Sequence, residues 1–131
     1  MMNQTEETKL LEQIEEWNDA DEFSRCIEAI EAIPEQERGY FLTVKLSRAY
    51  SNLAVLGDHG EHGTDSEVDG NLIQHAIRLL ESVRTQGEND PYWNARMGYS
   101  CLMAYSSATT ACEYAKPVSY THLTLPTNRE V

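Results

Sequence analysis

The chain has 131 residues, a formal net charge of −12 and 40% hydrophobic residues. This length allows one domain with an ordinary core. The acidic balance argues against a nucleic acid or an anionic membrane as partner, because phosphate repels such a surface. No apolar stretch reaches the roughly 18–20 residues that cross a bilayer, and the acidic N-terminus lacks the apolar segment of a signal peptide. An odd number of cysteines on predicted apolar helix faces favours a reduced, cytoplasmic compartment: Cys26, Cys101 and Cys112.

The hydrophobic pattern predicts helices in the first part of the chain. Apolar residues recur at helical spacing in 5–17, 20–33 and 39–56, and Pro34 ends the second segment. Thr5 is the expected N-cap of the first helix. We expect the apolar side of these helices to enter the core, with Leu10, Leu11, Ile14, Trp17, Phe23, Cys26, Ile27, Ile30, Ile33, Leu42, Leu46, Ala49, Tyr50 and Leu53.

An acidic, glycine-rich segment, residues 57–70, interrupts the pattern. It holds four glycines and five acids, so we expect a solvated loop. Its His59 and His62 could serve as ligands of zinc or nickel. However, ordering this loop around a metal costs much backbone entropy, and no cysteine lies at the spacing expected of a further ligand. Residues 65–70 begin like a calcium loop, but Ala76 stands where a bidentate carboxylate is needed. The sequence therefore predicts no metal site.

The helical pattern resumes in three further segments: 70–86, 91–106 and 107–116. Gly87 is an expected helix stop. Asp90 followed by Pro91 is typical of a helix start, because proline suits the first helical position. The apolar side of these segments comprises Leu72, Ile73, Ala76, Ile77, Leu80, Val83, Trp93, Met97, Cys101, Ala104, Tyr105, Ala108, Ala111, Cys112 and Ala115.

The sequence changes character after Pro117. Residues 118–127 carry no charged side chain, and their apolar and polar residues alternate as in a strand, although no preceding segment has a strand pattern with which they could form a sheet. This string resembles the in-frame translation of a transposon adapter used in DNA-sequencing libraries. We therefore expect 118–131 to be a non-native tail joined to a truncated gene, and the domain to comprise 5–117. The alternative is a natural extended tail.

Two helical segments carry a similar pattern, Leu46-Ser47 and Met97-Gly98. In each, a large apolar residue is followed by a small one that allows a paired helix to approach closely. The two copies lie 51 residues apart, which is a period of about 34 residues plus an insertion. Ala76 supplies a further small residue where the second helix of a pair crosses the first.

These positions resemble the tetratricopeptide repeat (TPR), and the chain is similar to the N-terminal helical region of uncharacterised bacterial TPR proteins. Tyr50 matches the usual tyrosine, whereas Cys101 replaces it in the second copy and Trp93 lies one position before the usual tryptophan. The resemblance covers about 40–116, with weaker support from 8–34. It implies an all-α right-handed superhelix of three antiparallel helix pairs: 5–17 with 20–33, 39–56 with 70–86, and 91–106 with 107–116. The alternative is an ordinary helical bundle.

In TPR arrays the first helix of each pair lines a concave face. The resemblance therefore assigns to that face Phe41, Val44, Lys45, Arg48, Asn52, Tyr92, Ala95, Arg96 and Tyr99. Cationic side chains in such a set can hold a carboxylate through charge-assisted hydrogen bonds. The candidate peptide-binding residues are Lys45, Arg48, Asn52, Arg96 and Tyr99. The alternative is that these bases pair with glutamates of neighbouring helices.

No catalytic motif, phosphate loop or dinucleotide fingerprint is present in the sequence. We expect a non-enzymatic interaction module, without cofactor or metal, that binds a peptide or protein segment of acidic character on the concave face. The alternative is an accessory or regulatory helical domain of a longer protein whose activity lies in a missing C-terminal region. Because no polar helix follows 107–116, we also expect self-association through that segment.

Overall fold

The computed structural model describes residues 3–60 and 68–106. Within these ranges the chain is all-α and contains no strand, which confirms the predicted fold class at this level. None of the described helices is long and apolar enough to cross a membrane. The α-helices are α1 (Gln4–Asp19), α2 (Phe23–Glu31), α3 (Tyr40–Leu56), α4 (Gly70–Ser82), α5 (Arg84–Gly87) and α6 (Pro91–Ser106). Two short 3-10 turns are η1 (Glu35–Glu37) and η2 (Asp58–Gly60).

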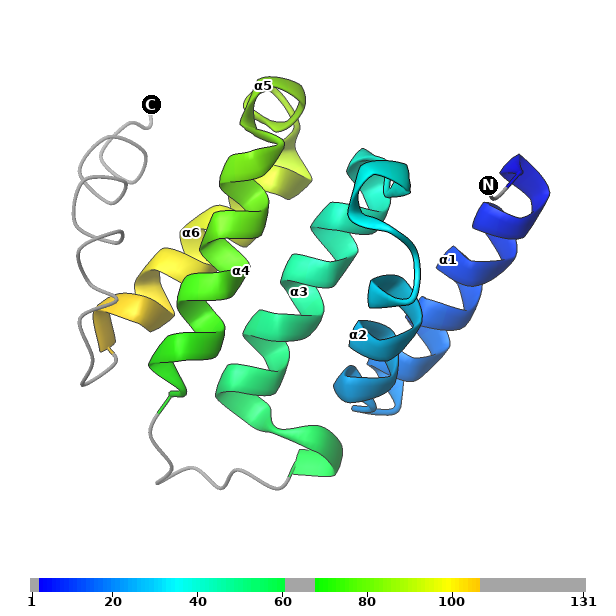
Figure 1. Ribbon diagram of the computed structural model, residues 1–131. Coiled ribbons are helices and arrows are strands. Elements are labelled where there is room, and N and C mark those ends of the chain that lie inside the picture. The colour runs from blue at the N-terminus through cyan, green and yellow to red at the C-terminus, as the bar shows by residue number, and fades with distance from the viewer. Residues whose placement is uncertain (1–2, 61–67, 107–131) are drawn as a thin grey trace.

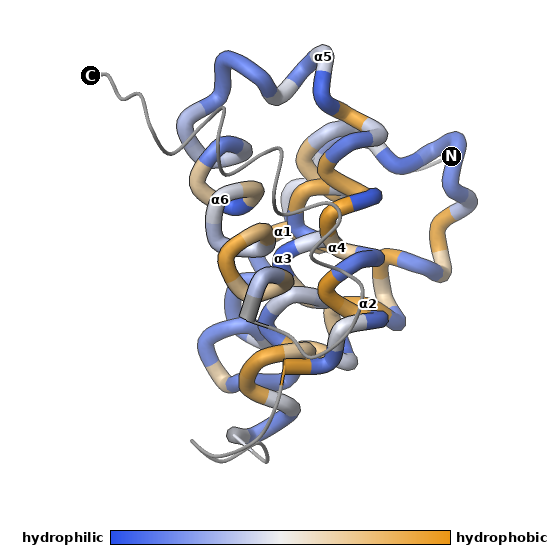
Figure 2. Tube along the Cα trace, turned by 90° about the vertical axis from the view of Figure 1, so that its left-hand side faces the viewer, coloured by the Kyte–Doolittle hydropathy of each residue, from blue (hydrophilic) through white to orange (hydrophobic). Residues whose placement is uncertain are grey.

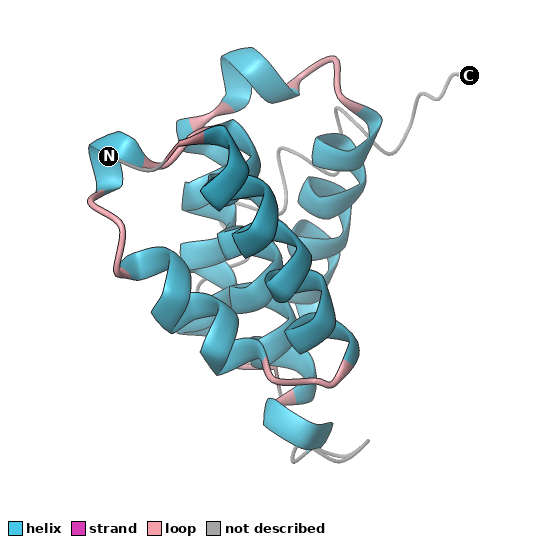
Figure 3. Ribbon diagram, turned by 90° about the vertical axis from the view of Figure 1, so that its right-hand side faces the viewer, coloured by secondary structure: helices cyan, strands magenta, loops and turns pink. Residues whose placement is uncertain are grey.

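The long helices form two layers. Consecutive helices pack against each other as α1–α2, α2–α3, α3–α4 and α4–α6, and α3 also contacts α1 and α6 (Figure 1). Figure 2 shows α6, α3 and α1 toward one side and α4 and α2 toward the other. Figure 3 views the molecule from the opposite side and shows that the described residues form helices joined by short loops. The first helix of each predicted pair therefore belongs to one layer, which we call the first-helix layer (α1, α3 and α6).

The core consists of two apolar clusters joined by α3. One cluster lies between α1, α2 and α3, around Ile14, Ile30 and Leu46. The other lies between α3, α4 and α6, around Leu80 and Trp93, and the indole Nε1 donates a hydrogen bond to the Leu80 carbonyl at 2.9 Å. The predicted core positions that are fully buried include Phe23, Cys26, Ala49, Ile73, Ala76, Ile77, Met97, Cys101 and Ala104, so the periodicity identified most of the buried faces. The prediction for Tyr105 was wrong: its side chain is 56% exposed, near the end of α6.

The close approach predicted from small residues is present between α3 and α4. Ser47 is buried, and its hydroxyl donates to the Ala76 carbonyl at 2.7 Å. A larger side chain at either position would separate the two helices. This contact places α3 and α4 as an antiparallel pair, as the sequence pattern predicted (Figure 1).

The start of α1 differs from the prediction. Asn3, and not Thr5, is the N-cap: its side chain accepts from the Glu6 amide at 2.8 Å, and Glu6 accepts from the Asn3 amide at 3.0 Å. This reciprocal pair is a capping box, which satisfies two backbone donors at once. The prediction of Thr5 as N-cap was wrong because Asn3 lies three residues before Glu6, the spacing of a capping box, whereas the residue three positions after Thr5 is Thr8.

Two predicted helices are shorter than expected. The helix predicted at 20–33 begins only at Phe23, because the chain turns through Asp21 with a positive φ of 58°. The helix predicted at 70–86 breaks at Val83, whose φ of −121° and ψ of 25° are not helical, and the remainder forms α5. The predicted helix 107–116 and the predicted tail 118–131 lie outside the described residues.

Candidate functional site

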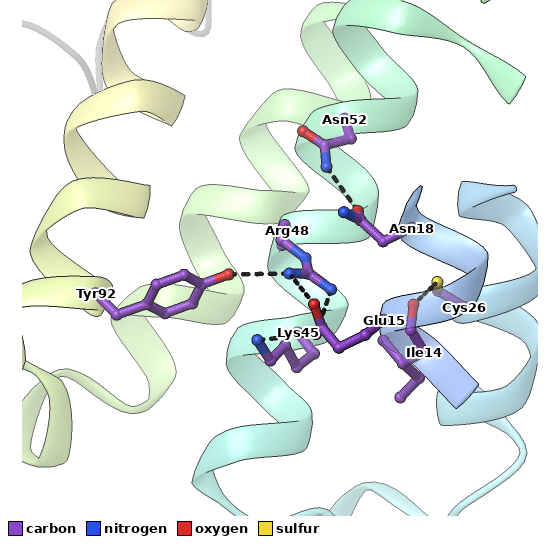
Figure 4. A network of polar contacts seen from close by, with 8 residues as sticks. All are labelled: Ile14, Glu15, Asn18, Cys26, Lys45, Arg48, Asn52 and Tyr92. Carbon is purple, nitrogen blue, oxygen red and sulfur yellow. Dashed lines mark hydrogen bonds and ion pairs between the residues drawn. The ribbon is translucent and has the colours of Figure 1, made fainter. Parts of the chain in front are cut away.

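The best-organised polar cluster lies on the first-helix layer. The Glu15 carboxylate of α1 accepts two hydrogen bonds from the Arg48 guanidinium of α3, Nη1–Oε1 at 3.1 Å and Nη2–Oε2 at 2.8 Å (Figure 4). Lys45 Nζ lies 3.1 Å from the same Oε2. Two-point pairing of this kind fixes the planes of both groups as well as their distance. Two of the five candidate residues, Lys45 and Arg48, therefore share one carboxylate of the chain itself, which offsets one of their two positive charges.

Tyr92 of α6 joins this cluster from the other side. Its hydroxyl lies 3.4 Å from Arg48 Nη1, and the Lys45 ammonium lies 4.7 Å from the centre of its ring (Figure 4). A cation over an aromatic face is attracted by the ring quadrupole. Tyr92 therefore links α6 to the α1–α3 ion pair.

The ion pair shifts the pKa values of Glu15 and Arg48 in opposite directions. Burial tends to raise the pKa of Glu15, but hydrogen bonds and charge from Arg48 and Lys45 outweigh it and lower the pKa below its usual value. Burial tends to lower the pKa of Arg48, but Glu15 and Tyr92 outweigh it and raise the pKa. Both groups are charged at neutral pH.

Arg96 of α6 occupies a different environment. Its Nη2 donates to the Ser51 hydroxyl at 2.6 Å and lies 3.4 Å from the Asn52 side-chain oxygen. The guanidinium stacks over the Tyr99 ring, 4.8 Å from the ring centre. Asn52 in turn donates to the Asn18 side chain at 3.0 Å (Figure 4). All five candidate residues thus lie on the first-helix layer, in two adjoining groups around Arg48 and Arg96.

The charge of Arg96 is not neutralised by a carboxylate among the described residues. Its Nε is buried and has no hydrogen-bond partner there. Burial, together with the charge of Arg48, lowers the pKa of Arg96 from its usual value. A guanidinium held by neutral groups alone retains an unmet preference for an anion, because taking a charge out of water is costly without a counter-charge.

Two hollows flank Phe41 on the same layer. One, of about 280 Å³, lies between α1 and α3 and is lined by Thr8, Leu11, Glu12, Glu15, Phe41 and Lys45. The other, of about 230 Å³, lies between α3 and α6 and is lined by Tyr40, Phe41, Val44, Lys45, Asp90 and Tyr92. Phe41 is 61% exposed, and Tyr92 is exposed as well. Val44, which the sequence assigned to the binding face, is buried and forms part of the second hollow's wall.

Sequence reasoning missed Glu15 and Ser51 as members of this cluster. Nothing local distinguishes Glu15 from the other glutamates of α1, since its partners lie 30 and 33 residues further along the chain. The one available signal is that residues 39–57 contain two bases and no acid. Such a segment needs acids from another helix.

The described part of the chain contains no group of three or more metal-ligating side chains. His59 lies 3.9 Å from Glu22 of the α2 start, and His62 lies outside the described residues. Asp58 has a structural role instead: its carboxylate accepts from the Ser24 amide at 3.0 Å and from the Ser24 hydroxyl at 2.5 Å. The start of the predicted loop therefore caps α2.

Comparison with known proteins found no match: no family model, no curated protein and no solved structure matches the chain.

Proposed function

We propose that this chain is a TPR-like, non-enzymatic interaction module that binds a carboxylate-bearing peptide or protein segment on the first-helix layer. The proposal that the helices form a TPR-like superhelix is supported by the α3–α4 contact between Ser47 and Ala76, at positions where the repeat has small residues. It is also supported by the packing of α3 against both α1 and α6.

Arg96 is the observation that carries the proposal. Lys45 and Arg48 already hold Glu15, so they orient the layer and keep one net positive charge between them. Arg96 is fixed by Ser51 and by the Tyr99 ring and lacks a counter-ion among the described residues. A planar guanidinium held in one orientation is well suited to a carboxylate, because both groups can bond at two points.

The test is a binding titration by fluorescence anisotropy with two fluorescein-labelled hexapeptides. One has the sequence Gly-Ser-Gly-Phe-Ser-Asp with a free C-terminus, and the other has Asn in place of Asp and an amidated C-terminus. We expect the acidic peptide to bind at least about tenfold more tightly, which corresponds to one charged hydrogen-bonded pair.

Arg96→Gln is expected to remove that difference, because the amide keeps a polar side chain of moderate length but not the charge. Arg25→Gln, an equal change of charge on the exposed surface of α2, is the matched control. Equal binding of both peptides, or an unchanged preference in Arg96→Gln, would refute the proposed function. Circular dichroism melting of both variants ensures that folded chains are compared.

A further inference from the structure

The hollow between α3 and α6 has apolar walls and polar groups that are already satisfied. Val44, which is 2% exposed, forms part of the wall, and the side chains of Tyr40, Phe41 and Tyr92 also line the hollow. Of its two charged side chains, Lys45 is paired with Glu15. Asp90 accepts from the Tyr40 hydroxyl at 2.5 Å and from the Tyr92 amide at 3.0 Å. The polar atoms of both side chains thus have partners, while the Asp90 carboxylate keeps its negative charge and disfavours an acidic side chain inside the hollow itself.

The same contacts fix the shape of the hollow. The Tyr40–Asp90 hydrogen bond joins the start of α3 to the residue that precedes α6 and so restrains the two helix ends relative to each other. The Lys45 ammonium over the Tyr92 ring holds that ring in place. A hollow that is formed before binding loses little conformational entropy when a ligand enters.

The size of the hollow matches one large apolar side chain. Its volume is about 230 Å³. An apolar cavity of about 150 Å³ is enough to hold a benzene molecule. The exposed rings of Phe41 and Tyr92 at its rim are the kind of apolar surface that marks an interaction site on an otherwise polar protein.

We infer that this hollow is the specificity pocket of the first-helix layer and takes one phenylalanine or leucine side chain from the bound segment of another protein. The inference rests on the proposed function, since the carboxylate of the same segment pairs with Arg96. Tyr92 at the hollow and Arg96 are four residues apart on α6, which is about 6 Å along the helix. An extended chain covers that distance in about two residues, so the apolar residue is two positions from the carboxylate.

Charge favours an acidic segment as the occupant. The chain as a whole carries a net charge of −12, which repels acidic ligands from most of its surface. Around the hollow and Arg96, however, the three cations Lys45, Arg48 and Arg96 face the two carboxylates Glu15 and Asp90, which leaves one net positive charge. The surface around the hollow and Arg96 is thus a part of the described surface where an acidic segment meets a net positive charge.

The experiment is the anisotropy titration with a series of free-acid hexapeptides that differ at one position. Phenylalanine, two residues before the terminal aspartate, is replaced by leucine, alanine or lysine. We expect the phenylalanine and leucine peptides to bind roughly tenfold or more tightly than the alanine peptide, because each buries a large side chain. The lysine peptide is expected to bind no more tightly than the alanine peptide.

The outcomes separate this inference from the proposed function. If all four free-acid peptides bind equally and more tightly than the amidated peptide, the pocket is refuted and the proposed function stands. If affinity follows the apolar side chain but not the carboxylate, the proposed function fails. Absence of binding by every peptide up to about 1 mM would refute both, because even a weak specific contact is detectable there.

A pair of exposed substitutions tests the location of the pocket. Phe41→Ala removes one wall and is expected to lower the phenylalanine-to-alanine affinity ratio by at least threefold, about half of one buried ring's contribution. Leu56→Ala removes an exposed side chain at the far end of the same helix and is expected to leave the ratio unchanged. An unchanged ratio in Phe41→Ala would overturn the inference. A dimer in light scattering that the phenylalanine peptide dissociates would do so too, because it would assign the pocket to a second copy of the chain.

Discussion

Glu15 on α1 and Arg48 on α3 form a two-point ion pair across the interface between the first two predicted helix pairs, with distances of 3.1 and 2.8 Å. Only 10% of the Arg48 side chain is accessible, whereas 46% of the Glu15 side chain is. The arginine can occupy this position because Glu15 supplies the counter-charge. The pair also fixes how α1 and α3 lie next to each other in the first-helix layer.

Glu15→Gln is expected to lower the free energy of unfolding by about 1–2 kcal/mol. Losing one partner of a fully buried pair costs roughly 3–5 kcal/mol, but water reaches the exposed part of Glu15 and reduces the effect. Urea denaturation measures the change. Glu16→Gln, on the exposed side of the same helix, is the control and is expected to change stability by less than about 0.5 kcal/mol. A loss as small as that of the control would mean that the pair has no role in stability.

The same carboxylate gives stability a defined dependence on pH. Its folded pKa lies below the usual value of 4.5. A group with a lowered folded pKa contributes stability above its unfolded pKa, and this contribution is lost as pH falls through the folded pKa. Urea midpoints measured from pH 7 to pH 3 are therefore expected to fall less steeply for Glu15→Gln than for the unaltered chain. Parallel curves would contradict this.

Asp58→Ala is expected to destabilise the domain by about 1 kcal/mol, the usual cost of removing a helix cap. The residue before α2, Glu22, makes no capping hydrogen bond with its side chain, and Asp58 supplies one from 34 residues away. Asp19→Ala, an exposed acid at the end of α1, is the control. Amide hydrogen exchange should show the loss at the start of α2, and unchanged protection of Ser24 would exclude this role for Asp58.

Asp58 also makes the cap sensitive to acid. Burial tends to raise its pKa, but the Ser24 hydrogen bonds outweigh this and lower the pKa below 3.8. The cap therefore contributes fully above pH 3.8 and weakens as pH falls below it. Replacing the aspartate with alanine is expected to remove this part of the acid sensitivity, which thermal melts at pH 3 and pH 6 measure.

Gly87→Ala is expected to cost about 1–3 kcal/mol by crowding the core. A Cβ at Gly87 would lie 2.3 Å from the Trp93 ring, and Trp93 is fully buried and bonded to the Leu80 carbonyl. Gly39→Ala is a matched control, since a Cβ there meets nothing within 4 Å. Thermal melting compares the two. Equal melting temperatures would show that the indole can shift to accommodate the methyl group.

The buried thiols are expected to react slowly in the folded state. Burial raises the pKa of Cys26 to about 11 and that of Cys101 to about 12, from a usual value of 9.0. Because the thiolate is the reactive form, its fraction at neutral pH falls about tenfold for each unit of pKa. In a Cys112→Ser chain, both thiols should react with a disulfide reagent at least about a hundredfold faster in urea than in buffer. Fast reaction in buffer would show that the two clusters open readily.

Local pattern was sufficient for the helices and for most of the core. Helical spacing identified the buried faces because apolar side chains three or four residues apart must lie on one side of a helix. Small residues also predicted the α3–α4 crossing, which the Ser47–Ala76 contact confirms. The helix at 91–106 was predicted with the observed bounds, since Asp90 and Pro91 form a strong local start signal.

Only the tertiary structure decided which polar groups meet. The sequence brought Lys45, Arg48 and Arg96 to one layer but did not show that Glu15 occupies the first two and leaves Arg96 to neutral partners. It gave no sign that Asp58 caps α2 or that Gly87 makes room for Trp93. Helix periodicity depends on residues that are close together in the chain, so a short stretch of sequence is enough to predict it. Charge pairing and capping across a loop depend on how residues 30 to 45 positions apart are brought together, and the Gly87–Trp93 packing depends on how the chain turns between α5 and α6. Both are set by the burial of the two apolar clusters.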